Sequence, residues 1–302
     1  MNGHAIEVSH LRVAFRVGGE ETVPVRDVSF SVPEHGRVAL VGESGCGKSL
    51  TALSLARLSP TDRASVSGDV RVNGRISYVF QNPTESLNPV MRIEDQIAEA
   101  LPASRRGSAA RGRIIELLAR TGLPDAERAA RSYPCGLSGG QQQRCMIAMA
   151  LASEPDVLVC DEPTTALDVT TQKQVLELID SLAAETGMAV LLITHNLGLV
   201  AGRMDSVNVM YAGRIVEAGP VLEVLSSPRH PYTQGLLAAV PALDAPRDAP
   251  LADIPGTVPP PSAWPPGCAF APRCSRAGDV CRRDAPPDVV SGLRRTACFF
   301  AS

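Results

Sequence analysis

Apolar and polar residues alternate along the first forty residues of the chain. Apolar side chains recur mostly at every second position through 6–15 and again through 28–32. This is the period of a half-buried β-strand, so we expect short strands over residues 5–41. The last of them, 37–41, runs directly into a glycine-rich segment, and from 48 to 58 the apolar positions take helical spacing. The order strand, loop, helix is therefore predicted here.

The middle of the chain alternates between the two kinds of element. Residues 66–79 have strand character, with Asn73-Gly74 as a hairpin turn signal. Residues 90–155 are largely helical, over 93–101, 111–121 and 141–153. Short apolar runs at 157–161 and 189–194 are typical of buried parallel strands, and an amphipathic helix is predicted between them, at 169–185. This alternation indicates an α/β fold with a parallel sheet and helices on its faces.

The composition changes after about residue 240. Of the 25 prolines, 12 fall in residues 241–302, which excludes regular helices and central strands from much of that stretch. We therefore expect two domains, 1–240 and a Pro/Cys-rich region at 241–302.

Half of the eight cysteines lie in this last region, at Cys268, Cys274, Cys281 and Cys298. A segment with so few core-forming residues gains order most simply from a metal centre. Their spacing lacks the C-x2-C pairs of zinc ribbons, and four thiolates also suit a 4Fe–4S cluster. We favour the cluster, with Zn²⁺ as the alternative and a tail with free thiols as the third possibility. The scattered Cys46, Cys135, Cys145 and Cys160 are expected to be small buried apolar residues.

Composition and charge exclude several classes of protein. With 302 residues and 44% apolar residues the chain can form a substantial core. A net charge of −3 and the lack of a long basic tract give no sign of nucleic-acid binding. We expect no signal peptide at the N-terminus. The longest apolar run, 145–152, is far shorter than the roughly 20 residues of a spanning helix, so any membrane role is expected to act through a partner.

The segment Gly42–Ser49 reads G-x-x-x-x-G-K-S. Successive backbone N–H groups in such a turn form an anion-binding concavity, and the following helix points its positive end at it. Lys48 is placed to reach the β- and γ-phosphates, and Ser49 to hold Mg²⁺. A glycine-rich turn without a ligand is the alternative, but the flanking strand and helix favour a phosphate loop.

Polar residues stand at the ends of three predicted strands. Asp161 and Glu162 end the apolar run 157–161. Beside a phosphate loop, Asp161 is expected to hold Mg²⁺ directly or through water. Glu162 is expected to polarise the attacking water, an assistance typically worth about 10²–10⁴ in rate. His195 and Gln81 also follow apolar strands. The two carboxylates could instead belong to a solvated turn, Gln81 could be a simple turn residue, and His195 could be a satisfied structural residue.

Residues 137–141, Leu-Ser-Gly-Gly-Gln, precede a long predicted helix. Ser138 is a good N-cap, and the glycines expose backbone N–H groups, so this is a second anion site. One ATP does not need two such sites in one chain. The simplest explanation is that this site serves an ATP bound by another subunit.

The order of these motifs resembles that of the ATP-binding subunits of ABC transporters, over about residues 5–240. The resemblance implies a parallel core sheet with an antiparallel β subdomain and a helical signature subdomain. It implies that His195 senses the γ-phosphate and that Gln81 joins Mg²⁺ and water to the loop facing the membrane subunits. It places Asp168 at a dimer loop, in 166–168, and Phe15 on the adenine. The implied nucleotide contacts are Gly42, Ser44, Gly45, Cys46, Gly47, Lys48, Ser49, Leu50 and Asp161, with Ser138, Gly140 and Gln141 facing the partner's ATP.

A narrower resemblance comes from residues 230–237, 254–259 and 266–274, which are similar to the dipeptide and oligopeptide importer ATPases. It implies ATP and Mg²⁺ as cofactors and peptide import as the function, at the cytoplasmic face of the membrane. The implied partners are two transmembrane permease subunits, a second related ATPase subunit and, indirectly, an extracytoplasmic substrate-binding protein. A nickel or sugar importer and a soluble ABC ATPase of cofactor assembly remain alternatives.

Overall fold

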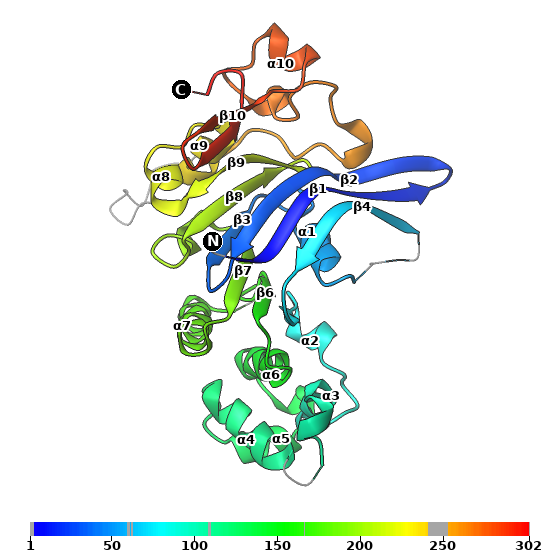
Figure 1. Cartoon of the computed structure of the whole chain (residues 1–302), viewed down its shortest axis with the longest axis vertical. Helices are drawn as coiled ribbons and strands as arrows, with labels where there is room; N and C mark the ends of the chain where they lie inside the picture. Colours follow the sequence, from blue (N-terminus) through cyan, green and yellow to red (C-terminus); the bar gives the residue numbers. More distant parts are fainter. Residues whose placement is uncertain are drawn as a thin grey trace. The chain divides into compact units, whose positions relative to one another are not determined.

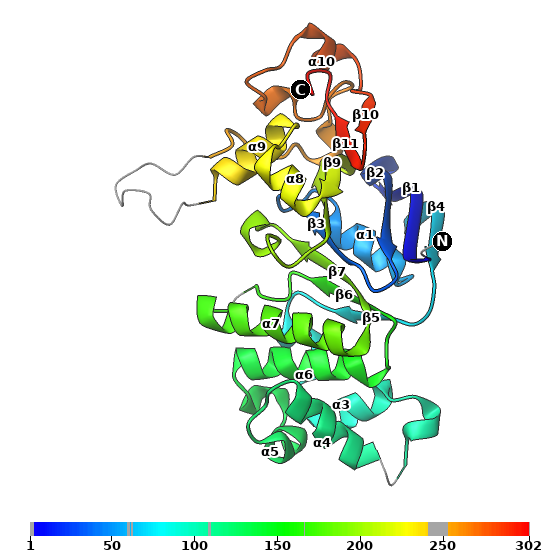
Figure 2. The same ribbon diagram turned by 60° about the vertical axis from the view of Figure 1, so that its left-hand side comes forward.

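The computed structural model describes residues 3–58, 61, 63–107, 110–165, 167–240 and 253–301. The chain forms two compact units, each assembled from separate stretches (Figures 1 and 2). Unit 1 comprises residues 1–5, 33–36 and 72–191, and unit 2 comprises 6–32, 37–71 and 192–302.

Unit 2 contains a mixed sheet. Its strands follow the order β4-β1-β2-β9-β8-β3, where β1 is His4–Val17, β2 Glu20–Pro33, β3 Arg37–Val41, β4 Ala64–Val72, β8 Ser206–Tyr211 and β9 Arg214–Pro220. The pairs β2–β9 and β3–β8 are parallel, whereas β8–β9 is antiparallel. The sheet is therefore mixed: it has parallel pairs, as predicted for the core, and an antiparallel strand β9 for which the sequence pattern made no prediction. Ala212 and Gly213, with φ of 46° and 77°, close a two-residue turn that brings β9 back antiparallel to β8.

The first two strands differ from the prediction in length. We expected short strands over residues 5–41, but β1 and β2 each span 14 residues. Gly18 and Gly19, with φ of 61° and 90°, join them, and a two-residue turn with positive φ at both positions suits the twist of a hairpin. The buried face includes Ile6, Val13 and Val28, each at most 1% exposed. The two alternating stretches thus belong to two long strands joined by a turn, and not to several short strands.

Unit 1 is mainly helical around a parallel strand pair, β5 (Ile76–Val79) and β6 (Val157–Asp161). Helix α6 contacts α2, α3 and α4, and its Met146 and Ile147 are fully buried. Every helix predicted here is confirmed to within two residues at each end. The helices are α2 (Pro83–Ser86), α3 (Ile93–Ala100), α4 (Ala110–Arg120), α5 (Ala126–Arg131), α6 (Gly139–Ala152) and α7 (Val169–Thr186).

The predicted hairpin at Asn73-Gly74 is wrong. Gly74 has a positive φ of 94°, as a turn requires, but the strands on either side do not pair with each other. β4 is a neighbour of β1, while β5 pairs with β6. The Asn73 side chain donates to the carbonyl of His4 at 2.6 Å, and the Arg75 N–H donates to Asp156 at 2.7 Å. These hydrogen bonds fix the turn, because the two flanking strands do not pair with each other.

Two helices, α8 (Val221–Ser226) and α9 (Pro231–Ala238), precede the predicted Pro/Cys-rich region. Within residues 253–301 the α-helix and the strands are short, namely α10 (Asp279–Arg283), β10 (Asp288–Ser291) and β11 (Arg294–Ala297), so much of the stretch lacks regular structure, as its prolines predicted. β10 and β11 form an antiparallel hairpin, and β11 also pairs with β9. The guanidinium of Arg294 donates to Glu217 at 2.6 Å, with both side chains at most 5% exposed. Residues 241–252 of the predicted Pro/Cys-rich region lie outside the described part of the chain.

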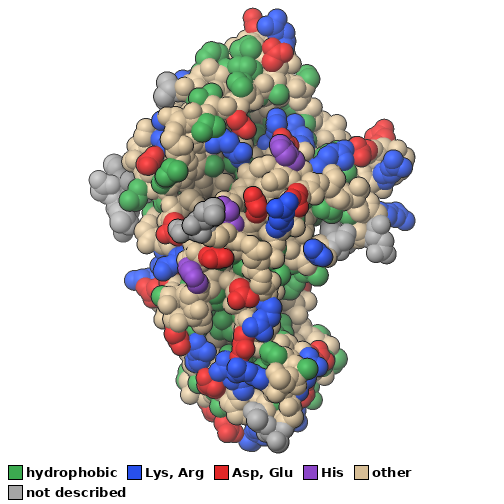
Figure 3. Space-filling model, in the orientation of Figure 1, with side chains coloured by type: hydrophobic (Ala, Val, Ile, Leu, Met, Phe, Trp, Pro, Cys, Tyr) green, Lys and Arg blue, Asp and Glu red, His purple; other side chains and the backbone are tan. Residues whose placement is uncertain are grey.

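The surface carries both signs of charge. Figure 3 shows Lys, Arg, Asp and Glu side chains interspersed over the face in view, in keeping with the net charge of −3. Within the described ranges, none of the helices combines the length and the apolar character that crossing a bilayer requires.

His230 gives this region a pH dependence. Its ring is 1% exposed, its Nδ1 accepts from the Tyr232 N–H at the start of α9, and burial lowers its pKa to about 3. The folded-state pKa is thus below the usual value near 6.5, so the unfolded chain binds more protons between these two pH values. The stability from neutral His230 is complete above pH 6.5 and is lost as pH falls toward 3.

We predict that His230→Asn, which keeps an N-cap acceptor but cannot titrate, reduces this dependence. Between pH 7 and pH 5 the wild-type free energy of unfolding should fall by about 2 kcal/mol more than that of the variant. Urea denaturation at both pH values measures the difference. Equal losses in the two proteins would show that His230 is not the group responsible.

Candidate nucleotide site

The phosphate loop lies in unit 2, between a buried strand and a helix, as predicted. β3 ends at Val41 and α1 (Lys48–Leu55) begins at Lys48, three residues shorter at its C-terminus than expected. Gly47 is the N-cap of α1 with φ of 98°, and a Cβ there would lie 2.8 Å from the Pro24 carbonyl oxygen. A larger residue would be strained both by conformation and by contact. The loop therefore turns where only glycine fits.

Lys48 is folded against its own loop. Its Nζ donates to the carbonyls of Gly42 at 2.8 Å and Glu43 at 3.0 Å, and the side chain is buried. The loop thus carries one ammonium group beside the first turn of α1, whose N–H groups and positive dipole end also favour an anion.

The remaining loop residues differ in exposure. Ser44, Gly45 and Ser49 are exposed, whereas Cys46 is fully buried. Burial raises the pKa of the Cys46 thiol, so the thiol is neutral and its side chain belongs to the core. Cys145 and Cys160 are also buried, as expected for the scattered cysteines, but the expectation is wrong for Cys135, which lies exposed in the turn Pro134–Gly136. Leu50 and Phe15, the predicted adenine contact on β1, are each half-buried.

Unit 1 brings the predicted carboxylates and Gln81 together. Because β5 and β6 are parallel and in register at Val79 and Cys160, both strands end at the same edge. Gln81 Nε2 donates to Glu162 Oε2 at 3.2 Å, and Thr165 Oγ1 donates to the same oxygen at 3.0 Å. Glu162 has a φ of 44°. This strained conformation costs about 1–3 kcal/mol and is typical of functional positions.

Tyr78 is a site residue that the sequence reasoning missed. Its hydroxyl donates to Asp161 Oδ2 at 2.7 Å, and burial, then the charge of Asp161, raises the pKa of the phenol above its usual value. Tyr78 therefore stays protonated and holds this carboxylate at the strand end. The parallel strands place Tyr78 opposite Val159, two residues before Asp161, so that its hydroxyl reaches the carboxylate, and the sequence pattern did not specify this register.

The signature segment begins α6 as predicted. Ser138 is the N-cap; its Oγ accepts from the Gln141 N–H at 3.4 Å, and the Gln141 side chain accepts from the Ser138 N–H at 3.0 Å. This reciprocal capping box satisfies two N–H groups at the helix start. Ser138 and Gly139 are exposed, and Gly140 lies close to Thr171, whose methyl would be 2.9 Å from a Cβ there. The exposed segment is available to a ligand from outside the chain.

Two further predicted residues lie at element ends. Asp168 is the N-cap of α7 and accepts from the N–H groups of Thr170 and Thr171. Bonds from Thr171 lower its pKa. His195, at the end of β7 (Ala189–Thr194), is exposed. Ala166, the first residue of the predicted dimer loop, lies outside the described residues.

The cysteines of the C-terminal region do not form an evident metal site. All eight cysteines fall within the described residues and are free thiols. Cys268, Cys274, Cys281 and Cys298 line one cavity. However, nowhere in the described chain are three or more His, Cys, Asp or Glu side chains arranged to hold a metal ion. The expected cluster is therefore not confirmed.

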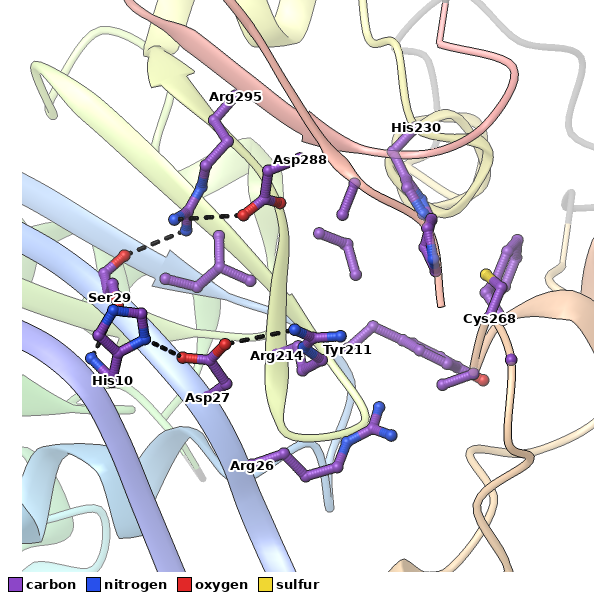
Figure 4. A pocket seen from close by; sticks show the side chains of 17 residues that line it. His10, Arg26, Asp27, Ser29, Tyr211, Arg214, His230, Cys268, Asp288 and Arg295 are labelled. Carbon is purple, nitrogen blue, oxygen red and sulfur yellow. Dashed lines mark hydrogen bonds and ion pairs between the residues drawn. The ribbon is translucent and has the colours of Figure 1, made fainter. Parts of the chain in front are cut away.

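A second pocket, of about 90 Å³, lies in unit 2 and contains none of the predicted nucleotide residues. Figure 4 shows its charged rim. Asp27 lies 3.0 Å from His10 Nδ1 and 3.3 Å from the Arg214 guanidinium, and Arg295 lies 3.9 Å from Asp288. Each of these two carboxylates thus faces an arginine, whereas the third lining arginine, Arg26, donates to the Ala212 carbonyl at 3.0 Å.

The fold and the loop define an ATP-binding cassette. A dimeric ATP-binding cassette solved in a post-hydrolysis state with ADP and Pi matches with a TM-score of 0.63 and 25% identity, over 72% of this chain and 98% of that one. The family described as "ABC transporter" matches residues 25–165. The family described as "Oligopeptide/dipeptide transporter, C-terminal region" matches residues 216–281.

Sequence relatives cover almost the whole chain. One from Brucella abortus (strain 2308) is 46% identical over 97% of this chain and 94% of its own length, and its name reads "Putative peptide import ATP-binding protein". A relative from Brucella ovis with the same description is 48% identical over 93% of this chain and 92% of its own. The chain belongs to the ABC transporter family of ATP-binding proteins and is an ABC-type ATPase.

We predict that Tyr78→Phe destabilises the protein. Removing a half-buried hydrogen bond to a carboxylate should lower the free energy of unfolding by about 1.5–3 kcal/mol. Urea denaturation measures the loss, with Tyr133→Phe as the matched control, because Tyr133 is 45% exposed and its change should stay within about 0.5 kcal/mol. A Tyr78→Phe variant as stable as the control would contradict the role given to this hydrogen bond.

Proposed function

We propose that the chain is the ATPase subunit of a peptide importer, peripheral at the cytoplasmic face of the membrane. The observation that carries the proposal is the pair of family matches in one chain, the ABC cassette at 25–165 and the oligopeptide/dipeptide C-terminal region at 216–281. The names of relatives at 46–48% identity support it. The proposed partners are two permease subunits, a second related ATPase and, indirectly, an extracytoplasmic substrate-binding protein.

The residues take the roles that their chemistry allows. The backbone N–H groups of Gly42–Ser49 and the Lys48 ammonium bind the phosphates, and Ser49 and Asp161 hold Mg²⁺. Glu162 polarises the attacking water. Gln81, which donates to Glu162 at 3.2 Å, orients that carboxylate and links it to Mg²⁺. The exposed His195 contacts the γ-phosphate.

The signature segment acts on a nucleotide held by the second ATPase. The structure around the segment supports this role, because Ser138 and Gly139 are exposed at the start of a 14-residue helix, where N–H groups and the helix dipole favour an anion. Gly140 and Gln141 complete this anion site. Asp168, capping α7, belongs to the same dimer contact, and Phe15 stacks on the adenine.

The catalytic role of Glu162 has a direct test. Glu162→Gln keeps the size of the side chain and removes the base, so MgATP binding should persist while turnover falls by about 10²-fold or more. Cells that contain only this variant should not take up a labelled tripeptide. ATP affinity, steady-state hydrolysis and uptake are measured for wild type and variant alike.

A conservative change elsewhere serves as its control. Glu223→Gln alters an exposed carboxylate on α8 and should leave all three measurements unchanged. Wild-type hydrolysis by Glu162→Gln would refute the catalytic assignment. Normal hydrolysis by the wild type, with peptide uptake unaffected when the chain is deleted, would refute peptide import but not the ATPase.

We also propose that Cys268, Cys274, Cys281 and Cys298 hold a 4Fe–4S cluster, with Zn²⁺ as the alternative. The donor set supports the proposal, because four free thiols line a single cavity together with Phe270 and Phe300. Burial, and then the neighbouring thiols, raise the pKa of Cys268 and Cys298, so both thiols are neutral without a metal. A bound metal would instead favour their thiolate forms. The centre would order the C-terminal segment.

Anaerobic purification with metal and sulfide analysis distinguishes the outcomes. We expect about four iron and four sulfide per chain and a visible absorption band, both lost in Cys274→Ser. The matched control is Cys135→Ser, which changes an exposed thiol in unit 1 and should keep the iron. Colourless protein with one zinc would support the alternative, and metal-free protein would refute the centre.

A further inference from the structure

The first variable residue of the phosphate loop is held by the C-terminal segment. Glu43 follows Gly42, and its carboxylate forms a two-point ion pair with Arg273, 230 residues further along the chain. Arg273 Nη1 donates to Glu43 Oε2 at 2.7 Å, and Nη2 donates to Oε1 at 3.0 Å. Planar bidentate pairs of this kind fix geometry as well as add energy.

The guanidinium of Arg273 is itself fixed on every side. The side chain is only 4% exposed. Its Nε donates to the Pro255 carbonyl at 2.8 Å and its Nη2 to the Ile254 carbonyl at 3.1 Å. The ion pair with Glu43 raises the pKa of Arg273, so its charge is constant. Arg273 thus ties the loop to the segment around 254–255 and to the turn that precedes Cys274.

The backbone of Glu43 is held by a second C-terminal residue. The Glu43 N–H donates to the Tyr232 hydroxyl at 2.8 Å. Tyr232, on α9, is fully buried, and its ring centroid lies 4.6 Å from that of Tyr211 and 5.4 Å from that of Phe270. Tyr211 also lines the pocket in Figure 4. A packed aromatic cluster therefore sets the position of this hydroxyl.

Glu43 in turn contacts the lysine of the loop. Its carbonyl accepts from Lys48 Nζ at 3.0 Å. The side chain, N–H and carbonyl of a single residue thus connect Arg273, Tyr232 and Lys48. A shift of Arg273 would displace the loop backbone to which the ammonium is bonded.

We propose that Arg273 and Tyr232 are positioning residues for ATP binding, which hold the phosphate loop in its binding shape through Glu43. This inference rests on the proposed role of Lys48 and its loop. We call the contacts of Arg273 and Tyr232 with Glu43 the clamp. Because the clamp orders the loop before nucleotide binds, loss of the clamp adds the free-energy cost of ordering the loop to the binding step. The affinity for MgATP should therefore fall, while hydrolysis at Glu162 should proceed once nucleotide is bound. The C-terminal segment is therefore a structural part of the ATP site.

The test measures MgATP affinity and steady-state kinetics of the full-length chain. Arg273→Gln should raise the Kd and KM for MgATP about tenfold and change kcat less than twofold. Arg273→Lys, which keeps the charge but loses the planar fork, should give an intermediate Kd. Glu43→Gln should resemble Arg273→Gln, and the double variant should be no worse than either single one.

Tyr232→Phe provides an independent variant. It removes one hydroxyl and keeps the aromatic packing, so it is expected to fold, and Kd should rise about threefold. Alkylation of Cys46, mapped by mass spectrometry, gives a second readout for the variants that do not touch this thiol. The thiol is buried within the loop, and its reaction should accelerate in Arg273→Gln and Glu43→Gln if the loop has loosened.

Arg294→Gln is the matched control. Arg294 forms an equally buried ion pair with Glu217 in the same C-terminal region, with side chains 5% and 0% exposed, but neither residue contacts the loop. Its Kd and its Cys46 reactivity should equal those of the wild type. The positioning role is overturned if Arg273→Gln and Tyr232→Phe bind MgATP like the wild type, or if Arg294→Gln weakens binding equally.

Lys48→Ala separates this inference from the proposed function. If Lys48→Ala abolishes MgATP binding and the clamp variants do not weaken it, only the positioning role fails. If Lys48→Ala binds MgATP normally, the assignment of the loop as the nucleotide site fails, and the clamp inference fails with it.

Discussion

The turn between β3 and α1 is the constraint around which unit 2 is built. At Gly42 a Cβ would meet the backbone of Met210 in β8, and at Gly47 it would meet the Pro24 carbonyl. The loop is therefore pressed between two strands of the sheet, and its amides are fixed before any ligand arrives. A preorganised set of N–H groups at a helix start is an anion site that needs little reorganisation. The same contacts with the strands therefore pack the loop into the sheet and fix the N–H groups that bind an anion.

The same unit extends this constraint into its C-terminal segment. Glu43 is bonded through its side chain to Arg273 and through its amide to Tyr232. The aromatic rings of Tyr211, Tyr232 and Phe270 pack beneath these bonds. A region that is rich in proline and poor in regular structure thus packs on the phosphate loop through these contacts. Any metal bound by the nearby cysteines would add to an arrangement that already has a protein framework.

Local rules predicted much of this structure. The N-cap at Ser138, the glycine-rich turn before Lys48 and the helices α3, α4, α6 and α7 follow from short-range chemistry, and they were found where expected. The turn at Asn73-Gly74 was recognised, but its hairpin was wrong, because a turn signal does not choose the partners of the strands beside it. The prediction of short strands was also wrong for β1 and β2, because the local pattern of apolar residues does not show where a strand ends.

Long-range pairs account for what the sequence did not predict. Tyr78 meets Asp161 only because β5 and β6 are parallel and in register. Arg273 meets Glu43 across 230 residues, and no periodicity or motif spacing encodes that contact. The proposed roles of Lys48 and Glu162 rest on motif chemistry, and those of Gln81 and His195 rest on the family resemblance. The predicted order of strand, loop and helix around Lys48 was found.

A structure of the full-length chain with Mg²⁺ and a non-hydrolysable ATP analogue tests the central claim most directly. The account predicts the triphosphate on the backbone of Gly42–Ser49, with Lys48 Nζ moved from the carbonyls of Gly42 and Glu43 onto a phosphate oxygen. The Arg273–Glu43 pair should remain intact in that complex. An analogue bound elsewhere, such as in the pocket of Figure 4, with Lys48 still bonded to its own loop, would contradict the account.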